Sequence, residues 1–147
     1  GNGLKALCES LNPHQEDGRL VLIFRLGVAA AKKYSSLLLK ELQQHSKNTM
    51  IVIDPMHGNT QRAQNGRKTR SLNDIENEMR IFASAARANS ARIHGIHLEA
   101  TPYDVTECVG LGVSEDDLLR RTYTTLCDPR LNAEQAMHIV QVFRESL

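Results

Sequence analysis

Residues 50–55 read Met-Ile-Val-Ile-Asp-Pro, and this stretch decides the fold class. Its apolar run is too short for a helix and apolar on both faces, which is typical of a strand in a covered parallel sheet. Residues 20–24 (Leu-Val-Leu-Ile-Phe) form a second such run. Weaker candidates are residues 93–99, interrupted by Gly95, and the β-branched run 122–127. We therefore expect four strands.

Helical patterns separate these strands. The clearest covers residues 71–88, where apolar side chains recur every three or four positions and lay one stripe along a helix: Leu72, Ile75, Met79, Phe82 and Ala86. Shorter helices are expected over residues 4–11, 32–44 and 114–121. The last helix begins at Asn132, with Gln135 in the capping-box position. Its expected buried face consists of Ala136, Ile139, Val140 and Phe143. The polar segment 60–68 is expected to be a flexible loop.

Alternation of strands and helices favours an α/β fold with parallel strands. The chain has 147 residues, so we treat residues 1–147 as a single domain. A (β/α)₈ TIM barrel takes roughly 250 residues, and this chain is long enough for about half of one. We therefore expect half of a TIM barrel, with four parallel strands and their helices. A free-standing doubly wound sheet is the competing architecture.

Composition excludes several classes of partner. There are 18 Lys and Arg against 17 Asp and Glu, a net charge of +1, so we expect no binding to nucleic acid or to an anionic membrane. No apolar run reaches the roughly 18 residues of a membrane helix, and the first residues do not resemble a secretory signal. Cys8, Cys108 and Cys127 form no C-x-x-C pair. This cysteine usage predicts no disulfide framework and a reducing, cytoplasmic setting.

Polar side chains follow each expected strand. They are Arg25, then Asp54 and His57, then His97 and Glu99, and finally Asp128. The carboxyl ends of parallel strands meet at one edge, where α/β folds bind ligands. If the four ends share a face, His57, Glu99 and Asp128 offer one nitrogen and two carboxylates to a divalent ion such as manganese, iron, cobalt or zinc. Each residue also has a simpler structural interpretation, as a hydrogen-bonded histidine or as part of an Asp-Pro turn. The spacing alone does not decide between a metal site and these structural roles.

Basic residues lie close to this set in the expected fold. Arg25 suits a bidentate grip on a carboxylate or phosphate, and Lys68 with Arg70 suits a second anion site. Glu107 is expected to be solvated or to cap a turn. The two cysteines of the second half, Cys108 and Cys127, are expected to be packed as small apolar groups.

Several long motifs resemble one family. The segments are 22–27 (L-I-F-R-L-G), 54–60 (D-P-M-H-G-N-T), 97–101 (H-L-E-A-T) and 127–132 (C-D-P-R-L-N), with Lys68-Thr69-Arg70 between them. In this order they resemble the class II, plant-type 3-deoxy-D-arabino-heptulosonate 7-phosphate synthases over nearly the whole chain.

The resemblance implies a TIM-barrel transferase of aromatic amino acid biosynthesis. Such an enzyme condenses phosphoenolpyruvate with erythrose 4-phosphate in the shikimate pathway and uses a divalent metal, with Mn²⁺ as the first expectation and Co²⁺, Fe²⁺ or Zn²⁺ as alternatives. It also implies that His57, Glu99 and Asp128 match metal ligands. Arg25 matches an arginine that holds phosphoenolpyruvate, and Lys68 matches a lysine near the sugar phosphate.

The sequence also departs from that family. It corresponds only to the C-terminal half of the barrel, and a family cysteine ligand and a K-x-G-P segment have no counterpart. His94 replaces a family glycine and adds a possible ligand or base, and Pro102 replaces another glycine after Glu99. Whether His94 or His97 joins the site is open.

Half a barrel exposes two strand edges and an apolar inner face. We therefore expect either a homo-oligomer or a separate chain that supplies the complementary half. The leading hypothesis for function is metal-dependent, aldol-type chemistry on phosphoenolpyruvate and a sugar phosphate. The alternative is a repurposed or non-catalytic half-barrel that acts as a binding or regulatory subunit. A third hypothesis is that the chain is a piece of a longer synthase.

Overall fold

The structure is a computed structural model that describes residues 2–147. Its helices are α1 (Asn2–Leu11), α2 (Val28–His45), α3 (Leu72–Ala88) and α4 (Ala133–Ser146). Its strands are β1 (Val21–Phe24), β2 (Met50–Ile53), β3 (Gln61–Arg62), β4 (Lys68–Thr69) and β5 (Gly95–Ile96). Two 3₁₀ turns, η1 (His57–Asn59) and η2 (Asp116–Leu119), complete the order of elements.

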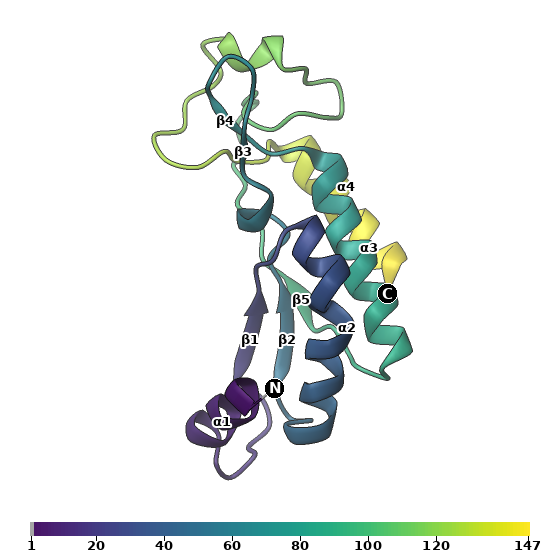
Figure 1. The fold of residues 1–147 in the computed structure, drawn as a ribbon. Coiled ribbons are helices and arrows are strands. Elements are labelled where there is room, and N and C mark those ends of the chain that lie inside the picture. The colour runs from purple at the N-terminus through teal and green to yellow at the C-terminus, as the bar shows by residue number, and fades with distance from the viewer. Residues whose placement is uncertain (1) are drawn as a thin grey trace.

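Three strands form a parallel sheet in the order β1-β2-β5 (Figure 1). β1 pairs with β2 along its whole length, with Phe24 opposite Ile53, and Ile53 in turn lies opposite Ile96 of β5. The first two strands of the sequence prediction are confirmed. The third is present but short, since only Gly95 and Ile96 of the expected 93–99 are strand residues. The described residues form a mixed α/β unit that does not close into a barrel.

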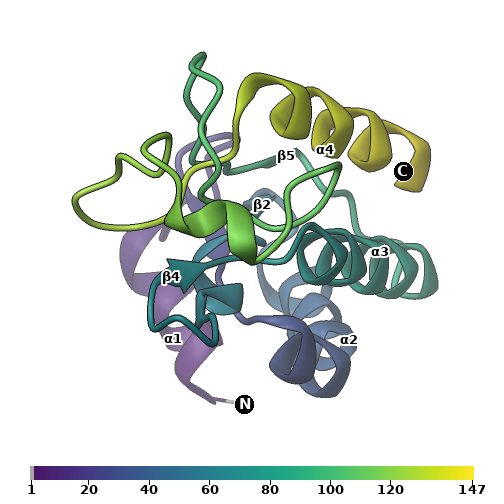
Figure 2. The same ribbon diagram turned by 90° about the horizontal axis from the view of Figure 1, so that it is seen from above.

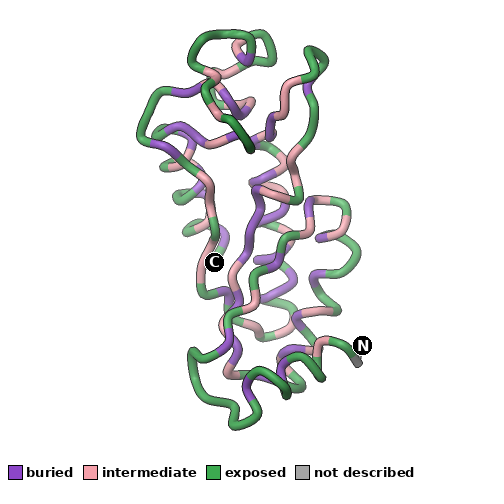
Figure 3. Tube along the Cα trace, turned by 90° about the vertical axis from the view of Figure 1, so that its left-hand side faces the viewer, coloured by how far each residue is buried: buried purple, intermediate pink, exposed green. Residues whose placement is uncertain are grey.

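One face of the sheet is covered and the other is open. Helices α2 and α3 lie on the same side of the strands, as Figures 1 and 2 show. Phe24, Ile51 and Ile53 are buried in the core on this side, together with residues of both helices. The alternate side chains of β1 point the other way, and Val21 and Ile23 are 44% and 47% exposed. Figure 3 views the molecule toward this uncovered side.

Helix patterning was predicted well for α3 and less well for α4. All five residues of the predicted α3 stripe are buried. In α4 the predicted capping box is present, because Asn132 and Gln135 exchange side-chain bonds with each other's backbone N–H. The predicted buried face of α4 is rotated, however: Val140 is exposed and Val142 is buried. No described helix is both long and apolar enough to span a bilayer.

The predicted fourth strand, residues 122–127, is wrong. These residues form an irregular loop. The backbone N–H groups of Thr124 and Thr125 donate to the carboxylate of Glu107, at 3.1 and 2.8 Å, instead of joining a ladder. Further along the chain, Leu131 forms a single parallel bridge with Ala100, which follows β5.

Two shorter predictions are also corrected. The segment predicted to be a flexible loop, residues 60–68, contains most of an antiparallel hairpin of β3 and β4, with Gln61 opposite Thr69. Its turn is closed by hydrogen bonds between Ala63 and Arg67 and between Gly66 and Ala63, each 2.9 Å. The predicted helix over 114–121 is the short 3₁₀ turn η2, whose start is fixed by the Asp117 carboxylate accepting from Ser114.

Two glycines bring the ends of β1 and β2 together. Gly27, the N-cap residue just before α2, has a φ of +78°, and a Cβ on Gly58 would collide with the Gly27 backbone. The buried carboxylate of Glu78 on α3 accepts from the N–H of Gly27 at 3.1 Å and from the side chain of Asn59 at 2.7 Å. Asn59 in turn accepts from the Val28 N–H at 3.1 Å. The turn that starts at His57 is therefore fastened to α2 and α3.

Gly58→Ala should destabilise the protein by about 1–3 kcal/mol, because the added methyl group must push the two turns apart. Gly95→Ala is the matched control, since the nearest atom to its new Cβ is 4.0 Å away. Urea unfolding of the two variants measures the difference. Equal stabilities would contradict the close contact between Gly27 and Gly58.

Candidate metal centre

Asp54, directly after β2, is the centre of a hydrogen-bond network. Its side chain is fully buried. One carboxylate oxygen accepts from the backbone N–H groups of Met56 and His57, at 3.0 and 3.1 Å. The other lies 2.7 Å from both Arg25 Nε and His57 Nδ1. Burial raises the pKa of Asp54, but these N–H donors and the His57 ring lower it more, so the pKa lies below its usual value.

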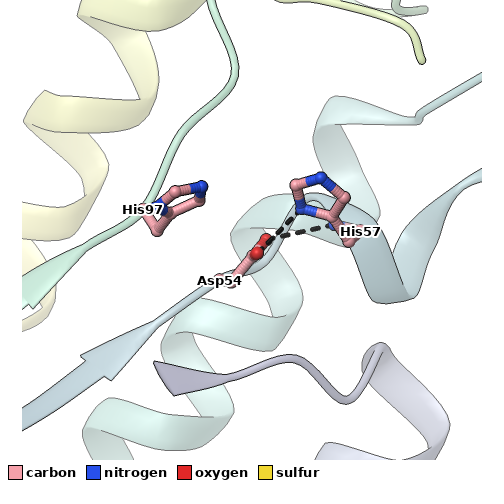
Figure 4. Close-up of side chains that lie close together, drawn as sticks. All are labelled: Asp54, His57 and His97. Carbon is pink, nitrogen blue, oxygen red and sulfur yellow. Dashed lines mark hydrogen bonds and ion pairs between the residues drawn. The ribbon is translucent and has the colours of Figure 1, made fainter. Parts of the chain in front are cut away.

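This contact orients the His57 ring (Figure 4). The ionised Asp54 carboxylate can only accept, so the proton resides on Nδ1 and the lone pair on Nε2 faces away from Asp54. Nε2 lies 3.7 Å from Glu99 Oε2. A histidine that donates one ring N–H to a carboxylate and leaves the other nitrogen free is arranged as metal-binding histidines are.

The structure brings together the three residues that the sequence analysis grouped. One potential ligand atom each from His57, Glu99 and Asp128 lies within 4.8 Å of the other two. His57 follows β2 and Glu99 follows β5, as expected for the carboxyl ends of parallel strands. Asp128 does not follow a strand but comes from the irregular loop before Leu131. We call His57, Glu99 and Asp128 the donor triad.

A basic residue pairs with each carboxylate of this region. Lys68 Nζ donates to Asp128 at 2.9 Å, and Arg70 Nη1 donates to Glu99 at 2.8 Å. The hydrogen bond between Lys68 and Asp128 raises the pKa of the lysine and lowers that of the carboxyl. Lys68 is 42% exposed and Arg25 is 50% exposed.

Arg70 is positioned differently from the other two cations. Its side chain is fully buried, and it also donates to the hydroxyl of Thr60 and to the carbonyl of Pro129. Its Nη2 has no hydrogen-bond partner among the described residues. Arg70 was predicted to supply a second anion site together with Lys68. In the structure its buried guanidinium binds the carboxylate of Glu99 and the carbonyl of Pro129, in the loop that carries Asp128.

The two histidines around β5 occupy opposite ends of that strand. His97 follows β5, and with Asp54 and His57 it forms a second cluster of potential ligand atoms (Figure 4). Its ring centroid is 6.0 Å from that of His57. His94 precedes β5, and its Nδ1 accepts from the N–H of Ile51. It lines a separate cavity of about 540 Å³ with Arg87 and Arg92, away from the triad.

Glu107 supports the Asp128 loop, and the expectation that it would be solvated is wrong. Its side chain is fully buried and forms an ion pair of 2.6 Å with Arg130. It also accepts the N–H groups of Thr124, Thr125 and Arg130. The sequence carries no local sign of this role, because the partners lie 17 to 23 positions away.

The cysteines correct one further expectation. Cys108 is buried as expected, and burial raises the pKa of its thiol to about 12. Cys127, expected to be packed, is exposed. Of the two, only Cys127 lies at the surface, beside Asp128.

The model of the class-II DAHP synthetase family matches residues 1–143. This chain belongs to that family. The resemblance noted in the sequence is thereby confirmed.

Named relatives in the family are phospho-2-dehydro-3-deoxyheptonate aldolases. The protein of Streptomyces coelicolor is 38% identical over 139 residues, which is 93% of this chain and 31% of the relative. That of Neurospora crassa is 39% identical over 143 residues, covering 92% and 29% of the two chains. That of Mycolicibacterium smegmatis is 36% identical, covering 95% and 30%. This DAHP synthetase-family chain thus spans about three tenths of the length of these relatives.

The stability that Glu107 contributes to this protein should be lost at low pH. Burial raises its pKa, but its bonds to Arg130 and to the Thr124 N–H lower it more, so the folded pKa lies below the ordinary 4.5. A carboxyl with a depressed folded pKa contributes stability that is complete above its unfolded pKa and is lost as pH falls through the folded value.

Glu107→Gln should therefore cost about 1–3 kcal/mol at pH 7 and much less near pH 3. Urea unfolding across this pH range measures the effect. Glu145→Gln, on the exposed face of α4, is the control and should change little. A stability loss for Glu107→Gln that stays constant with pH would contradict the depressed pKa.

Proposed function

We propose that this protein carries the metal-binding part of the active site of a 3-deoxy-7-phosphoheptulonate synthase-like enzyme, with His57, Glu99 and Asp128 as ligands. The observation that carries the proposal is the approach of their three ligand atoms to within 4.8 Å of one another. One imidazole and two carboxylates form a donor set of intermediate hardness. Mn²⁺ fits it, and Co²⁺, Fe²⁺ and Zn²⁺ are alternatives.

Neighbouring residues also orient the proposed ligands for a divalent ion. Asp54 fixes the His57 tautomer that leaves Nε2 free, and Arg70 fixes one oxygen of Glu99. A bound divalent ion in such a site acts as a Lewis acid that polarises a carbonyl oxygen. In the proposed reaction this carbonyl is the aldehyde of erythrose 4-phosphate or a related sugar phosphate.

The substrate contacts fall to the exposed cations. In this proposal Arg25, half exposed beside Asp54, holds the carboxylate or phosphate of phosphoenolpyruvate or a similar small anion. Lys68, on β4, holds the phosphate of the sugar. With both substrates fixed, the CH₂ carbon of phosphoenolpyruvate bonds to the aldehyde carbon, while the aldehyde C=O π bond opens to an oxygen that takes up a proton. Water then adds at C2 of the former enolpyruvate, and the phosphate leaves as inorganic phosphate to give the 2-keto product. The alignment of the two substrates supplies part of the rate enhancement. Arg70 acts as a positioning residue for Glu99 and does not touch substrate.

The uncovered sheet face calls for a partner surface. Val21 and Ile23 are nearly half exposed, and β1 is an edge strand of the described sheet. We propose that further barrel strands cover this face, from a second copy of the chain or from a complementary half. The same face is the observation that favours the second candidate function, a binding or regulatory subunit. The three free cysteines fit a reducing, cytoplasmic location.

Purified protein should bind Mn²⁺ with a stoichiometry of one, and His57→Ala or Glu99→Gln should abolish most of the binding. Asp54→Asn should weaken it about 10- to 100-fold, because the histidine loses its orienting carboxylate. His14→Ala, at an exposed position outside the cluster, is the matched control. Calorimetric titration with circular dichroism as a folding check measures these effects. Equal binding by wild type and His57→Ala would exclude the triad.

Sedimentation velocity should show a species larger than the monomer, and turnover of phosphoenolpyruvate with erythrose 4-phosphate and Mn²⁺ should follow that species. Val21→Glu with Ile23→Glu should shift the protein to monomer, because it places charge on the uncovered face. The exposed helix position Leu37→Glu is the control. A stable monomer with full turnover would contradict the need for a partner. Metal binding without turnover in any assembly would favour the binding subunit.

A further inference from the structure

The candidate site is electrically balanced by the protein itself. Its three carboxylates each form an ion pair with one basic side chain: Arg25 with Asp54, Lys68 with Asp128, and Arg70 with Glu99. Three negative and three positive charges sum to zero. A divalent cation that enters this set raises its net charge to +2, which is unfavourable until an anion follows.

The three cations differ in how freely they can respond. Arg70 is fully buried and fixed by Thr60 and Pro129 as well as by Glu99. Arg25 pairs with Asp54, which lies outside the donor triad. Only Lys68, among these three, pairs with a member of the triad and is also well exposed. Lys68 has three ammonium N–H donors on a flexible stem, so it can leave Asp128 when another anion is offered.

We propose that a divalent cation and a phosphoryl anion bind this site with positive cooperativity, and that Lys68 is the residue that couples them. The inference rests on the proposed function, because it needs Asp128 to be a metal ligand. A phosphoryl group that pairs with Lys68 releases Asp128 for the cation, and a cation that takes Asp128 releases Lys68 for the phosphoryl group. The coupling is reciprocal by linkage.

Charge complementarity selects this class of ligand. A phosphate monoester carries close to two negative charges at neutral pH, which matches the +2 that the cation adds. A monocarboxylate would leave the set positive, so it should couple less strongly than phosphate. In this proposal Lys68 therefore has two roles: it contacts the phosphate, and it couples phosphate binding to cation binding.

The experiment is Mn²⁺ titration of the purified protein, followed by electron paramagnetic resonance of free Mn²⁺. It is run with and without inorganic phosphate, with ionic strength held constant by chloride and with correction for Mn²⁺-phosphate pairing measured without protein. Phosphate should raise the Mn²⁺ affinity of the wild type about tenfold, and Mn²⁺ should raise the phosphate affinity by the same factor. Acetate in place of phosphate should have a smaller effect.

Lys68→Met should bind Mn²⁺ more tightly than the wild type when no phosphate is present, because Asp128 has lost its competing partner. The effect of phosphate on Mn²⁺ affinity should fall below about twofold in this variant. Lys68→Gln provides a second, polar substitution. Lys40→Met, which removes the same charge from an exposed position of α2, should retain the wild-type coupling.

Each result separates the hypotheses. Mn²⁺ binding that is independent of phosphate overturns the coupling and leaves the proposed metal centre standing. Full coupling in both Lys68 variants overturns the role of Lys68. Absence of Mn²⁺ binding by the wild type overturns the metal centre and this inference together.

Discussion

The arrangement of the site depends on the buried carboxylate of Asp54. A buried charge is tolerated only when donors surround it, and four N–H groups meet this one. They come from the turn after β2, from the His57 ring and from Arg25 after β1. The carboxylate thus joins two strand ends and sets the ring orientation of His57. Its ionisation at neutral pH is what leaves Nε2 of His57 directed at Glu99.

Around this centre, buried acids hold two of the polar segments. Glu78 fastens the Gly27 turn and Asn59, and Glu107 fastens the loop that carries Asp128. Arg70 is the buried base that joins Glu99 to Pro129. Several of their bonds go to backbone N–H and C=O groups, so they partly replace the strand ladder that an irregular loop lacks. The donor triad is therefore fixed although one of its members is not on a strand.

The sequence predicted the parts of the fold that rest on short-range patterns. β1, β2, α3 and the α4 capping box were recognisable because their signals, apolar runs and helical spacing, lie within a few residues. The strand predicted at 122–127 failed because β-branched residues there bond to Glu107, whose position in space no local pattern reveals. Burial of Arg70 was invisible for the same reason. Convergence of the donor triad was predicted from strand ends, although Asp128 arrives by a different route.

The buried acids and the uncovered apolar face of the sheet have different roles. The bonds that hold Asp54, Glu78 and Glu107 come from turns, loops and side chains of this chain rather than from the uncovered sheet face. Covering the apolar side chains of β1 would be favourable, because Val21 and Ile23 are nearly half exposed and burial of apolar surface lowers the free energy. Polar contacts at the strand ends thus fix the ligand geometry. The uncovered apolar face, which would bind a partner, is a different surface from these strand ends. The metal centre and the assembly can therefore be tested by different substitutions.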